Sequence, residues 1–134
     1  GVPDLVVGAP SGEEGGAAYL LLLKRDGTVS NSMQISQALP TVPSKWQSDK
    51  AVGFGSAVAG LGPLLGKDEV PDLAVGNPSF DDDKGAVFLM RMKADGHVDA
   101  VTVIGSGTEG FLEVLPSGSR FGASVAMLGD VDGD

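Results

Sequence analysis

Aspartates at the two ends of the chain form the pattern with the clearest chemistry. The chain stops at Gly-Asp-Val-Asp-Gly-Asp and starts with Gly-Val-Pro-Asp-Leu, so the two segments joined end to start read D-V-D-G-D-G-V-P-D-L. In a sharply turning loop, carboxylates at alternating positions can point inward together and offer the oxygen ligands that a hard cation prefers. The candidate ligands are the carboxylates of Asp130, Asp132, Asp134 and Asp4 and the carbonyl of Val2, with Gly1 at the turn.

Calcium is the cation that this donor set favours. Magnesium prefers stricter octahedral sites that keep several waters, and the segment offers no His or Cys for zinc. The twelfth position of the joined loop is Val7 rather than Glu, and a strand is expected after it, so the loop is not an EF-hand. We therefore expect a Ca²⁺ site that is complete only where a C-terminus meets an N-terminus.

A second loop of the same kind lacks the acids. Residues 63–73 read P-L-L-G-K-D-E-V-P-D-L, with Pro63, Leu65 and Lys67 at positions where acids would be needed. We expect no calcium in this loop. Either the Lys67 ammonium or apolar packing would take the place of the ion.

Both loops belong to a longer internal repeat. VPDLVVGAPS and VPDLAVGNPS share eight of ten residues, and FGSAVAGLG and FGASVAMLG share six of nine. A third pair of blocks follows the same order, and a fixed period of this size indicates tandem supersecondary units that cannot bury their apolar faces alone. The matched blocks, at spacings of 67 to 69 residues, are 2–11 with 70–79, 54–62 with 121–129, and 16–29 with 85–98.

Each period contains four candidate strands, which must position the loops. Asp26-Gly27 and Asp95-Gly96 predict tight hairpin turns because Gly accepts the positive φ that primed turns demand. Helical periodicity is nowhere sustained, so we expect an all-β chain. The expected strands are, in pairs, Phe54–Leu61 and Phe121–Leu128, Asp4–Gly8 and Asp72–Gly76, Ala17–Lys24 and Ala86–Lys93, and Val29–Ile35 and Val98–Ile104.

Four antiparallel strands repeated in tandem suit the blades of a β-propeller, with two blades in this chain as part of a larger or oligomeric propeller. Residues 1–53 would hold strands two to four and the connector of the first repeat. Residues 54–120 would form the second repeat, and residues 121–134 the first strand and the start of the calcium loop of the next.

The same residues resemble a known family. Phe54-Gly55 at a repeat start, the aspartate loop and Gly8-Ala9-Pro10, which has become Gly76-Asn77-Pro78 in the second copy, are similar to FG-GAP repeats, the blades of the integrin alpha-chain propeller. The resemblance implies a seven-bladed propeller, Ca²⁺ held in a β-hairpin loop, and an adhesion or ligand-binding role outside the cell.

Composition excludes several other functions. Nine Lys and Arg against 18 Asp and Glu give a net charge of −9, which argues against nucleic-acid binding. The longest apolar run, Ala17 to Leu23, is far shorter than the roughly 20 residues of a membrane-spanning helix, so no membrane insertion is expected. There is no Cys, no G-x-S-x-G and no pair of His, so we expect no enzyme in this stretch. The alternative is an accessory propeller region of a larger secreted enzyme, such as a phospholipase-like hydrolase.

The expected partners follow from the repeat. Two blades leave two apolar sheet faces bare, so the chain should be part of a longer chain or a homo-oligomer. A protein or glycan partner would bind loops at one face of the propeller, or further copies of the repeat would cover it. Because surface calcium loops of extracellular modules bind in the range of about 10⁻⁴–10⁻³ M, we expect an extracellular or cell-surface location.

Two further features have competing interpretations. Asp81-Asp82-Asp83, with Glu13-Glu14 at the matching place, predict a solvated loop, with a second cation or a basic partner as the alternatives. Trp46 and Phe111 in the connectors are expected to pack over a blade edge rather than to form a ligand-facing aromatic patch.

Overall fold

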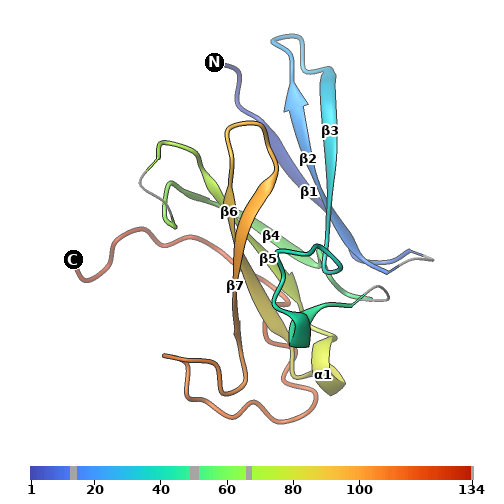
Figure 1. Ribbon diagram of the computed structural model, residues 1–134, viewed down its shortest axis with the longest axis vertical. Coiled ribbons are helices and arrows are strands. Elements are labelled where there is room, and N and C mark those ends of the chain that lie inside the picture. The colour runs from blue at the N-terminus through green and yellow to red at the C-terminus, as the bar shows by residue number, and fades with distance from the viewer. Residues whose placement is uncertain (13–14, 49–51, 66–67, 134) are drawn as a thin grey trace.

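The chain forms two antiparallel sheets (Figure 1). The computed structural model describes residues 1–12, 15–48, 52–65 and 68–133. The prediction of an all-β chain is confirmed. The first sheet has the order β1 (Leu5–Ala9), β2 (Ala17–Leu23), β3 (Val29–Ser36), and the second has the order β4 (Ala57–Gly62), β5 (Asp72–Asn77), β6 (Ala86–Met92), β7 (Val98–Gly105).

Six of the expected strands are confirmed, and the first and last residue of each agree with the prediction to within one residue. They are β1, β2, β3, β5, β6 and β7. β4 begins at Ala57 rather than at Phe54, because Phe54-Gly55 form a turn in which Gly55 has a φ of 90°. Among the described residues, the second sheet has the four strands expected of a repeat, and the first sheet has three.

The expected strand Phe121–Leu128 is wrong. Beyond an isolated bridge between Gly85 and Phe121, this stretch forms no sheet ladder in the described chain. A strand needs a neighbour for its backbone hydrogen bonds. β4 obtains them from β5, whereas residues 122–128 pair with no strand among the described residues.

The two hairpins repeat each other closely. Lys24 N donates to the carbonyl of Thr28 (2.8 Å), and Lys93 N donates to the carbonyl of His97 (2.9 Å). Gly27 has a φ of 83° and Gly96 a φ of 85°, as the tight-turn prediction requires. A register shift also accompanies each hairpin at the same place, between residues 22 and 23 and between residues 91 and 92.

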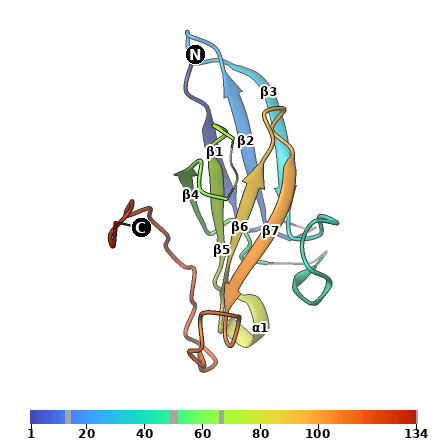
Figure 2. The ribbon, with the colours of Figure 1, turned by 60° about the vertical axis from the view of Figure 1, so that its left-hand side comes forward.

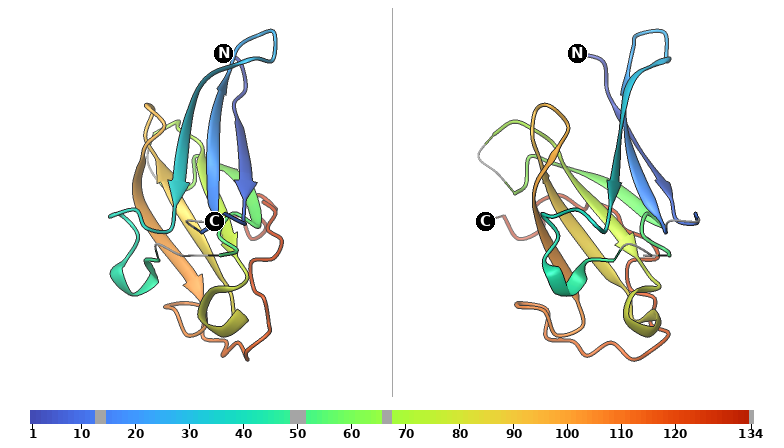
Figure 3. Two further views of the ribbon diagram at one scale, coloured as in Figure 1. Left: turned by 90° about the vertical axis from the view of Figure 1, so that its right-hand side faces the viewer. Right: turned by 45° about the vertical axis from the view of Figure 1, so that its right-hand side comes forward.

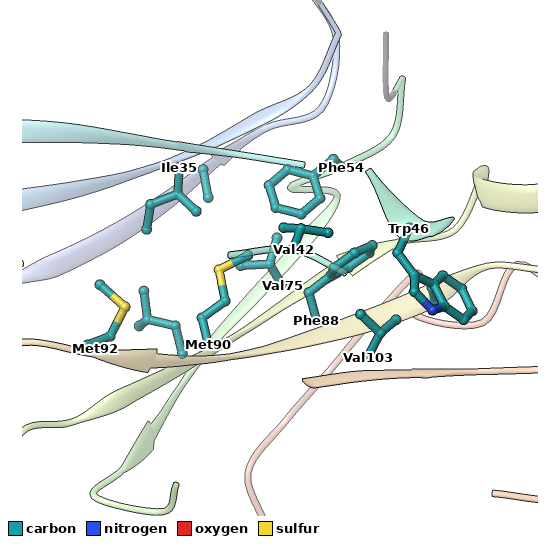
Figure 4. Packing of buried hydrophobic residues seen from close by; sticks show 12 residues of the cluster. Ile35, Val42, Trp46, Phe54, Val75, Phe88, Met90, Met92 and Val103 are labelled. Atoms are coloured by element: carbon teal, nitrogen blue, oxygen red, sulfur yellow. The ribbon is translucent and has the colours of Figure 1, made fainter. Parts of the chain in front are cut away.

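The main core lies between the two sheets, which meet there and diverge toward the N-terminus (Figures 3 and 4). Phe54 and Phe88 pack edge to face, with ring centroids 5.3 Å apart. The first sheet contributes Ala18 and Ile35, and the second contributes Val75. Burial of these apolar side chains is the main force that holds the layers together.

A smaller cluster lies on the other face of the second sheet. Its buried members are Leu61, Ala74 and Val87, and the half-buried Phe121 and Val125 pack against them. Since neighbouring positions of a strand point to opposite faces, Ala74 faces this cluster while Leu73 and Val75 face the main core. The stretch after Phe121 therefore starts a third layer.

The two connector aromatics each pack against another ring. Trp46, in the 3₁₀ turn η1 (Ser44–Trp46), is buried in the main core, and its ring lies 5.0 Å from that of Phe80. The ring of Phe111 stacks on Phe121 at 5.1 Å. Both rings therefore pack against another aromatic ring, Trp46 in the core and Phe111 at a half-buried position, while the blade edge itself stays a prediction. Among the described residues, no helix has the length and apolarity needed to cross a membrane.

Candidate cation site and the contacts that position it

Close backbone contacts fix each Phe-Gly pair onto the preceding repeat. A Cβ added to Gly8 would lie 1.9 Å from the carbonyl oxygen of Gly55, and one added to Gly76 would lie 2.0 Å from that of Gly122. No side chain fits at such distances. The glycine before Ala9-Pro10, and its counterpart in the second repeat, is therefore required by the Phe-Gly turn of the next unit.

A second pair of contacts repeats in the same way. A Cβ on Gly16 would lie 2.1 Å from the carbonyl oxygen of Phe54, and a Cβ on Gly85 would lie 2.1 Å from that of Phe121. Both sets of contacts recur with the sequence period. Phe121 and Gly122 therefore contact the second sheet in the same way that Phe54 and Gly55 contact the first sheet.

Asp72 in the second repeat is buried, and its carboxylate accepts hydrogen bonds from backbone amides. The residue is only 1% exposed. Met92 N donates to Oδ1 (3.0 Å), while Leu64 N and Leu65 N donate to Oδ2 at 3.0 and 2.5 Å. Three N–H donors satisfy this carboxylate without an ion, because hydrogen bonds to a charged acceptor are among the strongest in proteins.

Asp4 occupies the equivalent position of the first repeat but is exposed. Leu23 N donates to its Oδ1 (3.0 Å), as Met92 N does to Asp72. No residue that the structure describes donates a hydrogen bond to Oδ2 of Asp4. Oδ2 of Asp72 accepts hydrogen bonds from two amides, whereas Oδ2 of Asp4 accepts none from the described residues.

The surroundings of Asp4 leave room for a ligand. Asp4 lines a cleft of about 620 Å³ between the diverging sheets, together with Val2, Glu69 and Lys93. A cation and a short loop that carries further ligands could approach the carboxylate from this side.

The other expected ligands lie at the far end of the chain. Oδ1 of Asp130 accepts a hydrogen bond from Gly133 N (2.6 Å), which curls the loop, and Asp132 is exposed. Asp134 lies outside the described residues. The N-terminus and the C-terminal loop are apart in every view (Figures 1, 2 and 3), and the described residues hold no group of three or more His, Cys, Asp or Glu placed to bind a metal. The structure therefore does not bring Val2 and Asp4 to Asp130 and Asp132, and the calcium site stays a prediction. The oxygen-only donor set and the open side of Asp4 fit Ca²⁺.

The amides of Leu64 and Leu65 were not expected from the sequence. Of the two replacements considered for the ion, Lys67 lies outside the described residues. Of the apolar residues at acid positions, Pro63 is exposed and Leu65 is half-buried. A signal was present: an Asp that persists where the other acids of its loop are lost needs a partner other than a metal.

The acidic turn, Asp81-Asp82-Asp83 within α1 (Phe80–Asp83), holds the connector that leads to Phe121. All three residues have a positive φ, of 49°, 57° and 56°. Ser117 Oγ donates to Oδ2 of Asp82 (2.6 Å), and Arg120 N donates to the carbonyl of Asp83 (2.8 Å). The turn is thus more than a solvated loop. Glu13 and Glu14 lie outside the described residues.

Polar contacts at the hairpins lower three carboxyl pKa values. Hydrogen bonds from Thr28 hold the pKa of Asp26 below its usual value, and those from His97 do the same for Asp95. A hydrogen bond from Arg91, whose Nε lies 2.8 Å from Oδ2, lowers the pKa of Asp99.

No protein-family model matches the chain. The likeness to FG-GAP repeats therefore rests on the sequence motifs alone.

Proposed function

We propose that the chain is a pair of FG-GAP-type propeller blades of a non-enzymatic, calcium-binding protein that works outside the cell in adhesion, ligand binding or structural assembly. The observation that carries the proposal is the contrast between Asp4 and Asp72. Two equivalent carboxylates accept the same hydrogen bond on one oxygen. Only Asp72, whose loop has Pro63, Leu65 and Lys67 at the expected ligand positions, also accepts amide hydrogen bonds on its other oxygen.

Calcium would supply for Asp4 what the amides of Leu64 and Leu65 supply for Asp72. The ion would be held by Asp4, the carbonyl of Val2, and the carboxylates of the loop that enters from a C-terminus, Asp130, Asp132 and Asp134. When bound, Ca²⁺ would tie that loop to the start of β1 and fix the end of the first sheet. The role would be structural, since the ion binds the loop that precedes a strand and leaves the surface loops free for partners.

Calorimetric titration of the chain with CaCl₂, and with MgCl₂ for comparison, tests the proposal. We expect binding of Ca²⁺ at about 10⁻⁴–10⁻³ M and weaker binding of Mg²⁺. Asp132→Asn should weaken calcium binding by about tenfold or more, because a charged ligand is lost. Asp68→Asn is the matched control, since Asp68 is an exposed loop aspartate whose Oδ1 only accepts from Val70 N. Equal binding by both variants, or no binding by the natural chain, would contradict the proposal.

A further inference from the structure

A buried pair of side-chain amides joins the two repeats. Gln37, just after β3, and Asn77, at the end of β5, are 0% and 1% exposed. Asn77 Nδ2 donates to Oε1 of Gln37 (2.8 Å), and Gln37 Nε2 donates to the carbonyl of Trp46 (2.7 Å). Oδ1 of Asn77 accepts from Ser79 N (3.1 Å). Both amides therefore have a partner for the oxygen and for the nitrogen, as buried polar groups require.

The same connector places an aromatic ring on the second repeat. Trp46 lies at one end of the main core, where its ring packs with Phe80 (Figure 4). The ring also reaches the end of β7, because a Cβ added to Gly105 would lie 2.9 Å from Cη2 of Trp46. Gly105 does not have a positive φ, so the ring rather than the backbone conformation requires glycine at this position.

The three residues of the second repeat that contact the connector have different counterparts in the first repeat. A side-chain amide, an aromatic ring and an absent side chain are replaced there by a methyl group, an absent side chain and a hydroxymethyl group. The pairs, matched by the repeat spacing, are Asn77 with Ala9, Phe80 with Gly12, and Gly105 with Ser36. On the connector, Gln37 matches Ser106, whose Oγ instead accepts a hydrogen bond from Leu115 N (3.0 Å). The contacts therefore belong to the junction between the two sheets and not to the repeat as such.

We propose that these contacts form a lock that holds the second repeat against the first in a single arrangement. The lock consists of Gln37, Trp46, Asn77, Phe80 and Gly105. Apolar burial between the sheets is non-directional, so it supplies cohesion without choosing one way of packing. A buried amide pair is satisfied only when donor and acceptor meet at one relative position of the repeats. The core therefore holds the repeats together, and the lock makes their arrangement unique.

The lock lies where the two sheets meet, away from the cleft lined by Asp4 (Figure 3). Within the connector, Gln47 Nε2 donates to the carbonyl of Val42 (2.9 Å), and Val42 is buried in the main core. The chain on both sides of Trp46 is therefore fixed. No lock residue is a candidate ligand of the cation, so the inference goes beyond the proposed function and stands apart from it.

Replacing the amide pair with apolar residues of similar size separates uniqueness from stability. In a chain that carries both Gln37→Met and Asn77→Leu, the side chains fill the same space without the hydrogen bonds. We expect its urea midpoint to stay within about 0.5 M of that of the natural chain, because apolar replacement of a buried polar pair is often neutral. The arrangement should lose its uniqueness: in a ¹H–¹⁵N spectrum, the indole N–H of Trp46, the chain's single tryptophan, should give more than one peak.

The natural chain offers a second measurement that needs no substitution. The side-chain NH₂ groups of Gln37 and Asn77 should exchange their protons with water at least about tenfold more slowly than those of Gln34 and Asn31. The latter two residues are the matched controls, because both are exposed on β3. This measurement decides the question if the double variant does not fold.

Gly105→Ser tests the aromatic half of the lock by introducing the residue that the first repeat has at this position. The added Cβ would meet the ring of Trp46 and displace it, so acrylamide quenching of the tryptophan fluorescence should rise by about threefold or more. Gly60→Ser is the matched control, since a Cβ at Gly60 would meet nothing within 4 Å. Its quenching should equal that of the natural chain.

All three measurements are made in excess EDTA, so their outcome does not depend on the calcium proposal. A single indole peak in the folded double variant would overturn the proposal, because the amide pair would then add at most stability. Proton exchange of Gln37 and Asn77 as fast as that of the exposed amides would overturn it as well. So would quenching in Gly105→Ser that equals quenching in Gly60→Ser.

Discussion

Asp4 and Asp72 occupy the same position of the two repeats, and their carboxylates have different partners. Both accept a backbone hydrogen bond from the end of the strand that follows, Asp4 from Leu23 N in β2 and Asp72 from Met92 N in β6. Asp72 is buried and accepts two more from Leu64 N and Leu65 N, whereas Asp4 is exposed and keeps an oxygen without a described donor. In the second repeat backbone amides satisfy the whole carboxylate, whereas in the first repeat the open oxygen of Asp4 is the one that the proposed cation would bind.

The comparison extends to the apolar contacts. Phe54 of the first Phe-Gly pair is buried in the core between the two sheets. Phe121 of the second pair is half-buried on the far face of the second sheet. Substitutions at equivalent positions of the two repeats should therefore lower the free energy of unfolding by different amounts. The difference measures how much the packing of each repeat adds to stability.

The largest effect is expected for Phe54→Ala. Phe54 is fully buried against Phe88, so the substitution should lower the free energy of unfolding by about 4 kcal/mol through lost burial and the cavity left behind. Phe121→Ala, at the equivalent but half-buried position, should cost about 1–2 kcal/mol. Urea unfolding followed by far-UV circular dichroism measures both. Equal losses would show that the second Phe-Gly pair is already as fully packed as the first.

Gly8→Ala should cost about 3 kcal/mol, because the added Cβ would meet the Gly55 carbonyl oxygen at 1.9 Å and force the sheets apart. Gly60→Ala is the matched control: its Cβ would meet nothing within 4 Å, and the change should stay within about 1 kcal/mol. The same unfolding assay separates them. A Gly8→Ala chain as stable as the control would refute the close approach.

Asp72→Asn should lower stability by about 2 kcal/mol in the presence of EDTA, because an amide NH₂ replaces one of the oxygens that accept three N–H groups in a buried position. Asp4→Asn under the same conditions should cost less than about 1 kcal/mol, since the residue is exposed. Differences in the urea midpoint test this inequality, and a larger loss at Asp4 would reverse the comparison.

The smallest effect concerns an ion pair present in one repeat only. Asp99 pairs with Arg91 in the second repeat, where the first has Ser30 Oγ donating to the carbonyl of Leu22. The hydrogen bond from Arg91 lowers the pKa of Asp99, so its contribution is present above the unfolded-state pKa of about 4 and is lost as the pH falls through the folded-state pKa. Asp99→Asn should lower Tm by about 2 °C or less at pH 7 and leave it unchanged near about pH 2.5. A Tm difference that persists at the acid pH would show that the pairing is not its cause.

Much of the fold could be predicted from local pattern. The Val- and Leu-rich runs, with Asp-Gly, Ala-Pro and Asn-Pro as turn signals, predicted six strands to within one residue, because turns and apolar runs are properties of short stretches. Phe121–Leu128 carries the same pattern as β4 but forms no strand, since pairing depends on a neighbour rather than on the segment.

The candidate site was less predictable. The aspartates could be found by their spacing, but the amides of Leu64 and Leu65 have no sequence signature, because every non-proline residue carries an N–H. The positive φ values of Asp81, Asp82 and Asp83 were equally hidden. They accompany a hydrogen bond from Ser117 in the connector to Asp82, about 35 residues earlier, which local pattern does not predict.

Melting of the natural chain and of Asp4→Asn, each in about 2 mM calcium and in excess EDTA, tests the central claim most directly. Calcium should raise the Tm of the natural chain by about 5 °C and leave that of Asp4→Asn unchanged. In EDTA the two chains should melt close together. Equal melting of the natural chain with and without chelator, or a full calcium response in Asp4→Asn, would contradict the assignment of the open carboxylate to a cation.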